Sequence, residues 1–111
     1  MATISNLFID QNADFTTTVT VNDSNNSALD LTGYTAVGMV RKSYSSSTST
    51  SFTIVFESPR TLGQITMSLT DVQTGALSSG RYVYDLVITS SGGDKTRVVE
   101  GIATIKPSVT R

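Results

Sequence analysis

The chain has 111 residues, with eight Lys and Arg against nine Asp and Glu and a formal net charge of −1. This length suits one domain with a single modest core, and without a basic excess we expect no nucleic-acid partner. Because the chain has no Cys and no His, disulfides, thiolate metal sites and the commonest general base are excluded. Charged residues make up only 15%, so we expect part of the surface to be covered in an assembly. A Thr-rich β surface without a partner is the alternative.

The N-terminal segment 1–10 has no basic region and no long apolar run, so it does not match a signal peptide. The longest apolar stretch, residues 34–40, is far shorter than the ~20 residues of a membrane helix. We therefore expect a soluble protein that is made in a cytoplasm and has no membrane partner.

The first predicted strand covers residues 15–21, where Phe15, Val19 and Val21 alternate with Thr. A period of two puts the apolar set on one face of a strand, which we expect to be the core face. The turn-forming residues 22–27 then end this strand.

A second strand is expected over residues 34–42, after a bend at Gly33. Residues 43–51 are Ser and Thr apart from Tyr44. Such a composition cannot bury enough apolar area to order itself, so this segment is predicted to be an exposed loop.

Two further strands are predicted at residues 52–56 and 65–69, with a turn at residues 58–63 between them. The segment 71–77 follows a Thr-Asp pair that is typical of a helix start. Its internal Gly and its shortness allow only a turn or two of helix.

A long hairpin is predicted near the C-terminus, with strands at residues 82–88 and 95–106 and a loop at residues 91–94. Tyr82 follows a Leu and a Gly at the start of a late strand, which resembles the tyrosine corner of immunoglobulin-like and fibronectin-like domains. We expect its hydroxyl to return to the backbone a few residues upstream.

Together these segments predict one all-β domain over residues 1–111, an antiparallel β-sandwich of immunoglobulin-like type. It should have about seven strands and at most one short helical turn near residues 71–77. The residues expected in its core are Phe15, Val19, Phe52, Ile54, Ile65, Leu69, Leu86 and Ile88.

The best candidate for catalysis is a pair of carboxylates in the hairpin. If residues 91–94 form the loop, Ser90 lies opposite Lys95 and Asp85 lies opposite Glu100 on one rung, an arrangement found in acid/base dyads. A slip of register, or a neighbouring Arg at 81 or 97, would cancel it. We therefore expect no enzyme activity, no cofactor and no metal site.

Two segments are candidates for contacts with a partner. One is the basic and aromatic cluster at the end of the second predicted strand, which otherwise is a solvated strand end. The other is the C-terminal tail 107–111, where Pro cannot donate to a sheet ladder and the chain is left to be ordered from outside. The candidate contact residues are Arg41, Lys42, Tyr44, Pro107, Val109 and Arg111.

Several short motifs occur in a characteristic order along the chain: "DF", "LTGY", "RKSY", "GRYVYD", "EG" and "VTR". In this order they resemble the small virion structural proteins of tailed bacteriophages, particularly those of marine cyanobacteria. They are also similar to the N-terminal β-sandwich of phage baseplate upper proteins, which attaches a receptor-binding apparatus to the tail.

The resemblance implies a non-enzymatic virion protein, made in the host bacterial cytoplasm and located on the capsid, neck, tail or baseplate. Its partners would be other virion proteins, and it would act as a homo-oligomer or in multiple copies. The alternative function is a β-sandwich module that binds a carbohydrate or a receptor, because exposed aromatic rings near polar side chains, such as Tyr44 in its Ser/Thr loop, can hold sugars.

Overall fold

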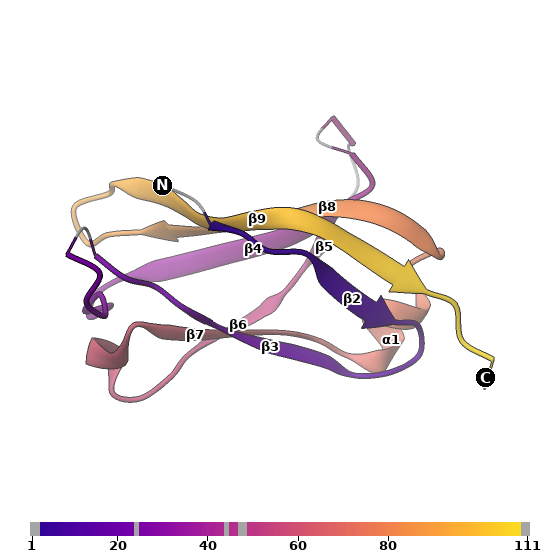
Figure 1. The fold of residues 1–111 in the computed structure, drawn as a ribbon, viewed down its shortest axis with the longest axis horizontal. Helices are drawn as coiled ribbons and strands as arrows, with labels where there is room; N and C mark the ends of the chain where they lie inside the picture. The colour runs from indigo at the N-terminus through magenta and orange to yellow at the C-terminus, as the bar shows by residue number, and fades with distance from the viewer. Residues whose placement is uncertain (1–2, 24, 44, 47–48, 110–111) are drawn as a thin grey trace.

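Two β-sheets pack face to face in the computed structural model, which describes residues 3–23, 25–43, 45–46 and 49–109 (Figure 1). Sheet A has the strand order β1-β9-β8-β4-β5, with β2 also paired to β9, and sheet B has the order β3-β7-β6. The strands are β1 (Thr3–Ile4), β2 (Leu7–Asp10), β3 (Phe15–Thr20), β4 (Thr35–Arg41), β5 (Thr50–Ser51), β6 (Thr53–Phe56), β7 (Gln64–Leu69), β8 (Gly80–Thr89) and β9 (Lys95–Lys106).

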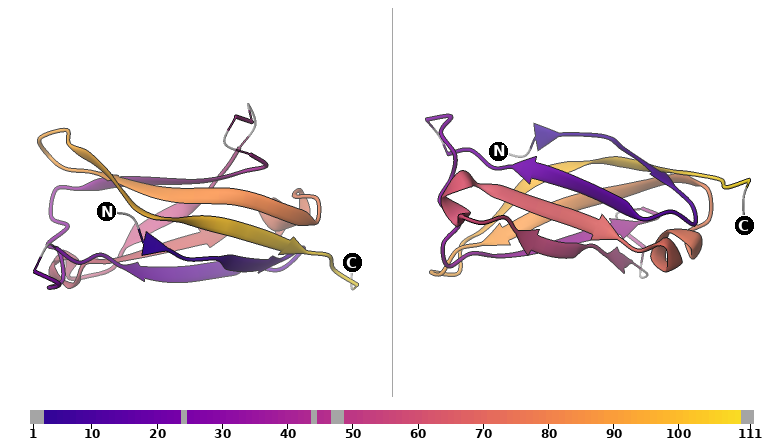
Figure 2. Two further views of the ribbon diagram at one scale, coloured as in Figure 1. Left: turned by 45° about the horizontal axis from the view of Figure 1, so that its top comes forward. Right: turned by 90° about the horizontal axis from the view of Figure 1, so that it is seen from below.

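The predicted β-sandwich is confirmed, and the left view of Figure 2 shows sheet B as a separate layer below sheet A. Placing β3, β7 and β6 in one sheet and β9, β8 and β4 in the other is the division of strands found in immunoglobulin-like domains. The alternation of apolar and polar residues decides the inner faces: along β8 and β7 every second residue is buried.

The N-terminal strands correct the expectation of a purely antiparallel fold with about seven strands. Both β1 and β2 pair with β9 in parallel, and nine strands are present in the described residues. The parallel pairing is possible because one edge of β9 is otherwise unpaired. Along this edge, Leu7 and Ile9 point into the core while the chain runs toward the start of β3. Ile9 is fully buried there.

Between β1 and β2, the backbone of Ser5 passes very close to the backbone of Gly101 on β9. A Cβ atom on Gly101 would lie 2.2 Å from the carbonyl oxygen of Ser5, so only glycine allows this contact. The Ser5 carbonyl also accepts a hydrogen bond from the hydroxyl of Tyr84, and burial raises the pKa of that hydroxyl above its ordinary value. The N-terminal segment is therefore fastened to the middle of sheet A.

The hairpin of β8 and β9 has a longer loop than predicted. Thr89, not Ser90, lies opposite Lys95, and a bulge between Leu86 and Val87 then restores the predicted pairing of Asp85 with Glu100. Val98 is the extra residue of this β-bulge, and it shifts the register of β9 by one position relative to β8.

The tyrosine corner is confirmed. The Tyr82 side chain is buried, and its hydroxyl donates a hydrogen bond to the carbonyl of Ser78 at 3.0 Å. This bond connects the start of β8 to the segment that leaves the helix α1 (Asp71–Gly75). That helix is as short as predicted, and a capping box between Thr70 and Gln73 begins it.

The predicted loop 43–51 needs one correction, because its last two residues form β5 and pair with Met39 and Val40. Backbone hydrogen bonds do not depend on the side chains that made this segment look disordered. Phe52 anchors the pairing, since it is 5% exposed and its amide donates to the Gly38 carbonyl at 2.9 Å.

The core lies between the sheets and contains the predicted residues. Five of them are buried, while Phe15, Val19 and Ile54 are half-buried and pack against the others. Aromatic rings join the two sheets: Phe52 lies 6.2 Å from Tyr84 and 6.5 Å from Phe15 between ring centroids. Tyr84 stands two residues after the corner tyrosine, where antibody domains have a cysteine of their inter-sheet disulfide.

Candidate interaction surface

The outer side of sheet A carries an unusual mixture of apolar and charged side chains. The strands β4, β8 and β9 direct alternate residues outward, opposite to their buried positions. We call this surface the sheet A face, and it consists of Ile4, Phe8, Val37, Met39, Arg41, Arg81, Val83, Asp85, Val87, Arg97, Glu100, Ile102, Thr104 and Lys106, whose Nζ lies 5.7 Å from the centre of the Phe8 ring.

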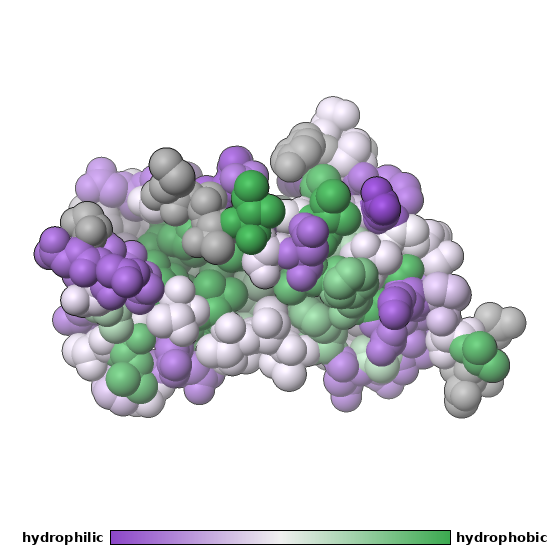
Figure 3. Space-filling model, viewed as in Figure 1, coloured by the Kyte–Doolittle hydropathy of each residue, from purple (hydrophilic) through white to green (hydrophobic). Residues whose placement is uncertain are grey.

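Several apolar side chains of the sheet A face are well exposed. Ile4 is 76%, Phe8 66% and Val37 54% exposed, and Figure 3 shows apolar side chains on the surface over β1, β2 and β9. A hollow of about 340 Å³ lies on the same face, over β4 and β8, between Val37, Val87 and Arg97. Exposed apolar side chains gathered on one face of a protein are typical of sites of association.

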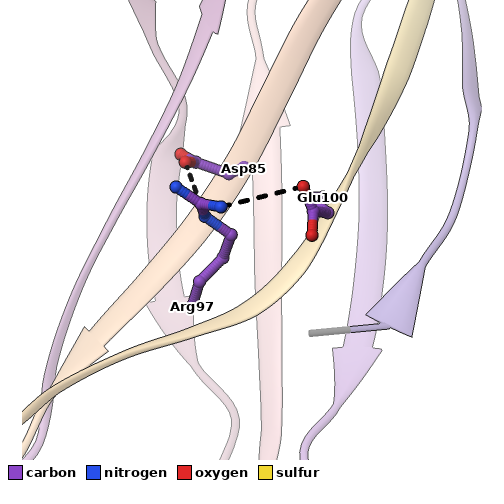
Figure 4. A network of polar contacts seen from close by, with 3 residues as sticks. All are labelled: Asp85, Arg97 and Glu100. Atoms are coloured by element: carbon purple, nitrogen blue, oxygen red, sulfur yellow. Dashed lines mark ion pairs between the residues drawn. The ribbon is translucent and has the colours of Figure 1, made fainter. Parts of the chain in front are cut away.

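Three charged side chains lie among these apolar residues (Figure 4). The Nε of Arg97 is 3.2 Å from Asp85, and its Nη1 is 3.8 Å from Glu100. We call these residues the Arg97 cluster. All three are part-exposed, so each pair contributes about 0–1 kcal/mol to stability.

The Arg97 cluster decides how the two carboxylates behave as a pair. They face each other across one rung, as predicted, but the guanidinium lies between them (Figure 4). Its positive charge offsets part of the repulsion between the two negative charges. The cluster leaves one surplus negative charge on the sheet A face.

The two basic residues of the predicted basic and aromatic cluster, Arg41 and Lys42, have different surroundings at the end of β4. Arg41 lies on the sheet A face, and its Nη1 donates to the Ser46 carbonyl at 2.7 Å. Lys42 instead places its Nζ 4.7 Å from the centre of the Tyr82 ring. The third member, Tyr44, lies outside the described residues.

The C-terminal tail leaves the end of β9, beyond its pairing with β2. Pro107 is exposed and Val109 is 97% exposed, while the amide of Ser108 donates to the Gln11 side chain at 3.3 Å. Arg111 lies outside the described residues.

A second site lies at the end of the sandwich where the loops 22–34 and 90–94 meet. This end cleft has a volume of about 480 Å³, an apolar floor that includes Ile88, and walls that include Tyr34, Asn26 and Asp94. Sequence reasoning missed it because the loops are far apart in the chain. The turn composition of each loop was the available signal.

Within the part of the chain that the structure describes, no three His, Cys, Asp or Glu side chains are grouped so that they could hold a metal ion. No helix in these residues is both long and apolar enough to cross a membrane.

Comparison with known proteins finds matches among solved structures. No family model and no curated protein matches the chain. The Lin-41 filamin domain is 17% identical with a TM-score of 0.49, and the match covers 89% of this chain and 82% of that chain. A chain from the complex of ICOS with ICOS-L and an anti-ICOS-L VNAR domain is 11% identical with a TM-score of 0.48. That match covers 96% of this chain but only 56% of the other.

Proposed function

We propose that this protein is a non-enzymatic structural subunit of a tailed-bacteriophage particle and that it docks on neighbouring subunits through the sheet A face. The observation that carries the docking role is the exposed apolar surface of that face, interrupted by the Arg97 cluster and bordered by Arg41 and Arg81. Protein interfaces also combine apolar side chains with polar and charged ones.

The phage context is supported by the ordered motifs that resemble virion proteins. In this proposal the protein is made in the host cytoplasm and becomes part of the capsid, neck, tail or baseplate, with other virion proteins as its partners. Sheet edges offer a further contact, because in the described residues β3 has a strand neighbour on one side only. An edge of this kind can accept a strand from a neighbour.

Mass spectrometry of purified particles tests the proposal, with Val87→Glu as the informative variant. Val87 lies on the sheet A face and is half-buried there, so a new carboxylate should spare the fold and prevent docking. The control Thr53→Glu places the same group at an exposed outward position of sheet B. We expect wild-type and control chains in particles and loss of Val87→Glu. Absence of the wild-type chain would defeat the structural role.

Deletion of residues 107–111 tests the tail as an additional anchor. The deletion removes little packed apolar area, since Val109 is almost fully exposed, so folding should be kept. Incorporation into particles should fall, as measured by the ratio of this chain to the major capsid protein. Normal incorporation would exclude the tail as an anchor.

A carbohydrate-binding role is the second candidate, and the end cleft is the observation that favours it. Tyr34 offers an aromatic ring and Asp94 a carboxylate on the walls of one open cavity, which are groups that sugars use. Saturable binding on a glycan array that is lost in Tyr34→Ala and in Asp94→Asn would support this function. Unchanged binding in both variants would exclude the cleft.

A further inference from the structure

We propose that the sheet A face is self-complementary and binds the same face of a second copy of this chain, with the two β8 strands stacked antiparallel and Val83 at the centre. The inference rests on the proposed function, since it names the neighbour that the docking surface contacts. It makes a second copy, rather than a different virion protein, the occupant of this face.

The order of side chains on β8 carries the argument. Its outward residues are Arg81, Val83, Asp85 and Val87 in succession, about 6.6 Å apart for a strand rise of about 3.3 Å per residue. A two-fold axis in the interface that crosses β8 at Val83, at right angles to the strand, places Arg81 of each copy over Asp85 of the other. Parallel stacking would instead place like charges together, which is unfavourable.

The charges needed for this contact are available. Arg81 is exposed and has no ion pair among the described residues. Asp85 directs only its Oδ2 atom to Arg97, and a carboxylate can accept several hydrogen bonds. The surplus negative charge of the Arg97 cluster would then be balanced by the arginine of the second copy.

The apolar residues follow the same symmetry. Ile102 pairs with Val83 across the sheet, so it also lies on the axis and meets its own copy. Ile4 lies beside Glu100, one row to one side, and Phe8 lies beside Thr104, one row to the other. The rotation exchanges these rows, so Ile4 of each copy would cover Phe8 of the other.

Two positions in this register oppose like charges: Arg41 meets its own copy, and Arg97 of each copy meets Lys106 of the other, because the rows of Arg97 and Lys106 lie two rows to either side of the axis. Arg41 pairs with Val83 across the sheet and therefore lies on the axis row. Its guanidinium already donates to the Ser46 carbonyl and contacts the sulfur of Met39. Because the two copies of Arg41 repel each other, Arg41→Gln should strengthen dimer association. Loss of Arg81, which attracts Asp85 of the other copy, should weaken it.

Sedimentation velocity over a range of protein concentrations tests the inference on the full chain. We expect a reversible dimer in the wild type and at least tenfold weaker association in Arg81→Glu. The control Thr53→Glu puts the same carboxylate on an exposed outward position of sheet B, and its association should be unchanged. Circular dichroism of each variant checks that the fold is kept.

The charge swap Arg81→Asp with Asp85→Arg is the decisive variant, because in a two-fold dimer it recreates both pairs with reversed sign. Recovery of association to within about threefold of the wild type supports the antiparallel register, and failure to recover overturns it. A wild-type chain that stays monomeric at every concentration overturns the inference, and so does equal weakening by the control. A chain that dimerises in this way but is absent from particles would instead defeat the proposed function alone.

Discussion

The outer faces of the two sheets are built from similar strands but present different chemistry. The outer side of sheet B carries mostly hydroxyl groups, and these bond to one another: Thr18 lies 3.0 Å from Thr66, whose hydroxyl donates to Glu57 at 2.7 Å. The sheet A face has Val, Ile and Met at the equivalent outward positions. Thr and Val have nearly the same shape and both favour strands, so this difference does not arise from strand formation.

What differs between the faces is their relation to water. Hydroxyl groups can form hydrogen bonds with water. Exposed methyl groups on the sheet A face cannot, and the free energy of the system falls when another surface removes them from water. A single exposed Val55 on sheet B does not alter this contrast, because scattered apolar residues are normal on surfaces. The comparison therefore indicates which side of the sandwich is suited to association.

The largest effects should come from the inner sides, where the two sheets share one core. Leu86 behind the sheet A face and Ile65 in sheet B are both 0% exposed, so Leu86→Ala and Ile65→Ala should each lower the free energy of unfolding by about 2–5 kcal/mol. Urea denaturation measures both. A much smaller loss in one sheet would mean that the difference between the faces extends into the core.

A smaller loss is expected for Tyr82→Phe, which removes the hydroxyl bond to Ser78 behind the sheet A face. The free energy of unfolding should fall by about 1 kcal/mol, with a lower melting temperature in calorimetry. An unchanged melting temperature would mean that the corner does not stabilise this end of sheet A.

The Arg97 cluster lies in the middle of sheet A, yet its ion pairs should contribute little to the free energy of unfolding. Arg97→Met removes both ion pairs, and we expect a loss of about 0.5 kcal/mol that shrinks at high salt, because the groups are part-exposed. Thermal denaturation at two salt concentrations measures this. A loss above 2 kcal/mol would show that the cluster holds the sheet together rather than serving a partner.

The smallest effect is expected on the outer side of sheet B. Thr66→Val replaces a hydroxyl by a methyl among the exposed Thr residues, and stability should change by no more than about 0.5 kcal/mol. Its association state in sedimentation should equal that of the wild type. New self-association of Thr66→Val would show that an added methyl group on sheet B also causes association. The chemistry of the two outer faces would then not decide which side associates.

The candidate site was predictable in part. The pairing of Asp85 with Glu100 followed from counting residues in the hairpin, and Arg97 was one of two arginines considered as a neutralising neighbour. The apolar part of the sheet A face was missed, although β8 has apolar residues in both phases of its alternation. A strand that is covered on both sides has this pattern, so it was the available signal.

Features of the local sequence were enough to predict most of the architecture. Alternation with a period of two, turn residues and a capped short helix are read from neighbours in the sequence, and they predicted the sandwich, the corner at Tyr82 and the inner faces. The parallel pairing of β1 and β2, the bulge that realigns Asp85, the different surroundings of Arg41 and Lys42 and the end cleft were decided by the tertiary structure alone. Each depends on backbones and side chains that meet across long stretches of chain, because register and edge pairing are set by the packed sheets and not by any one segment.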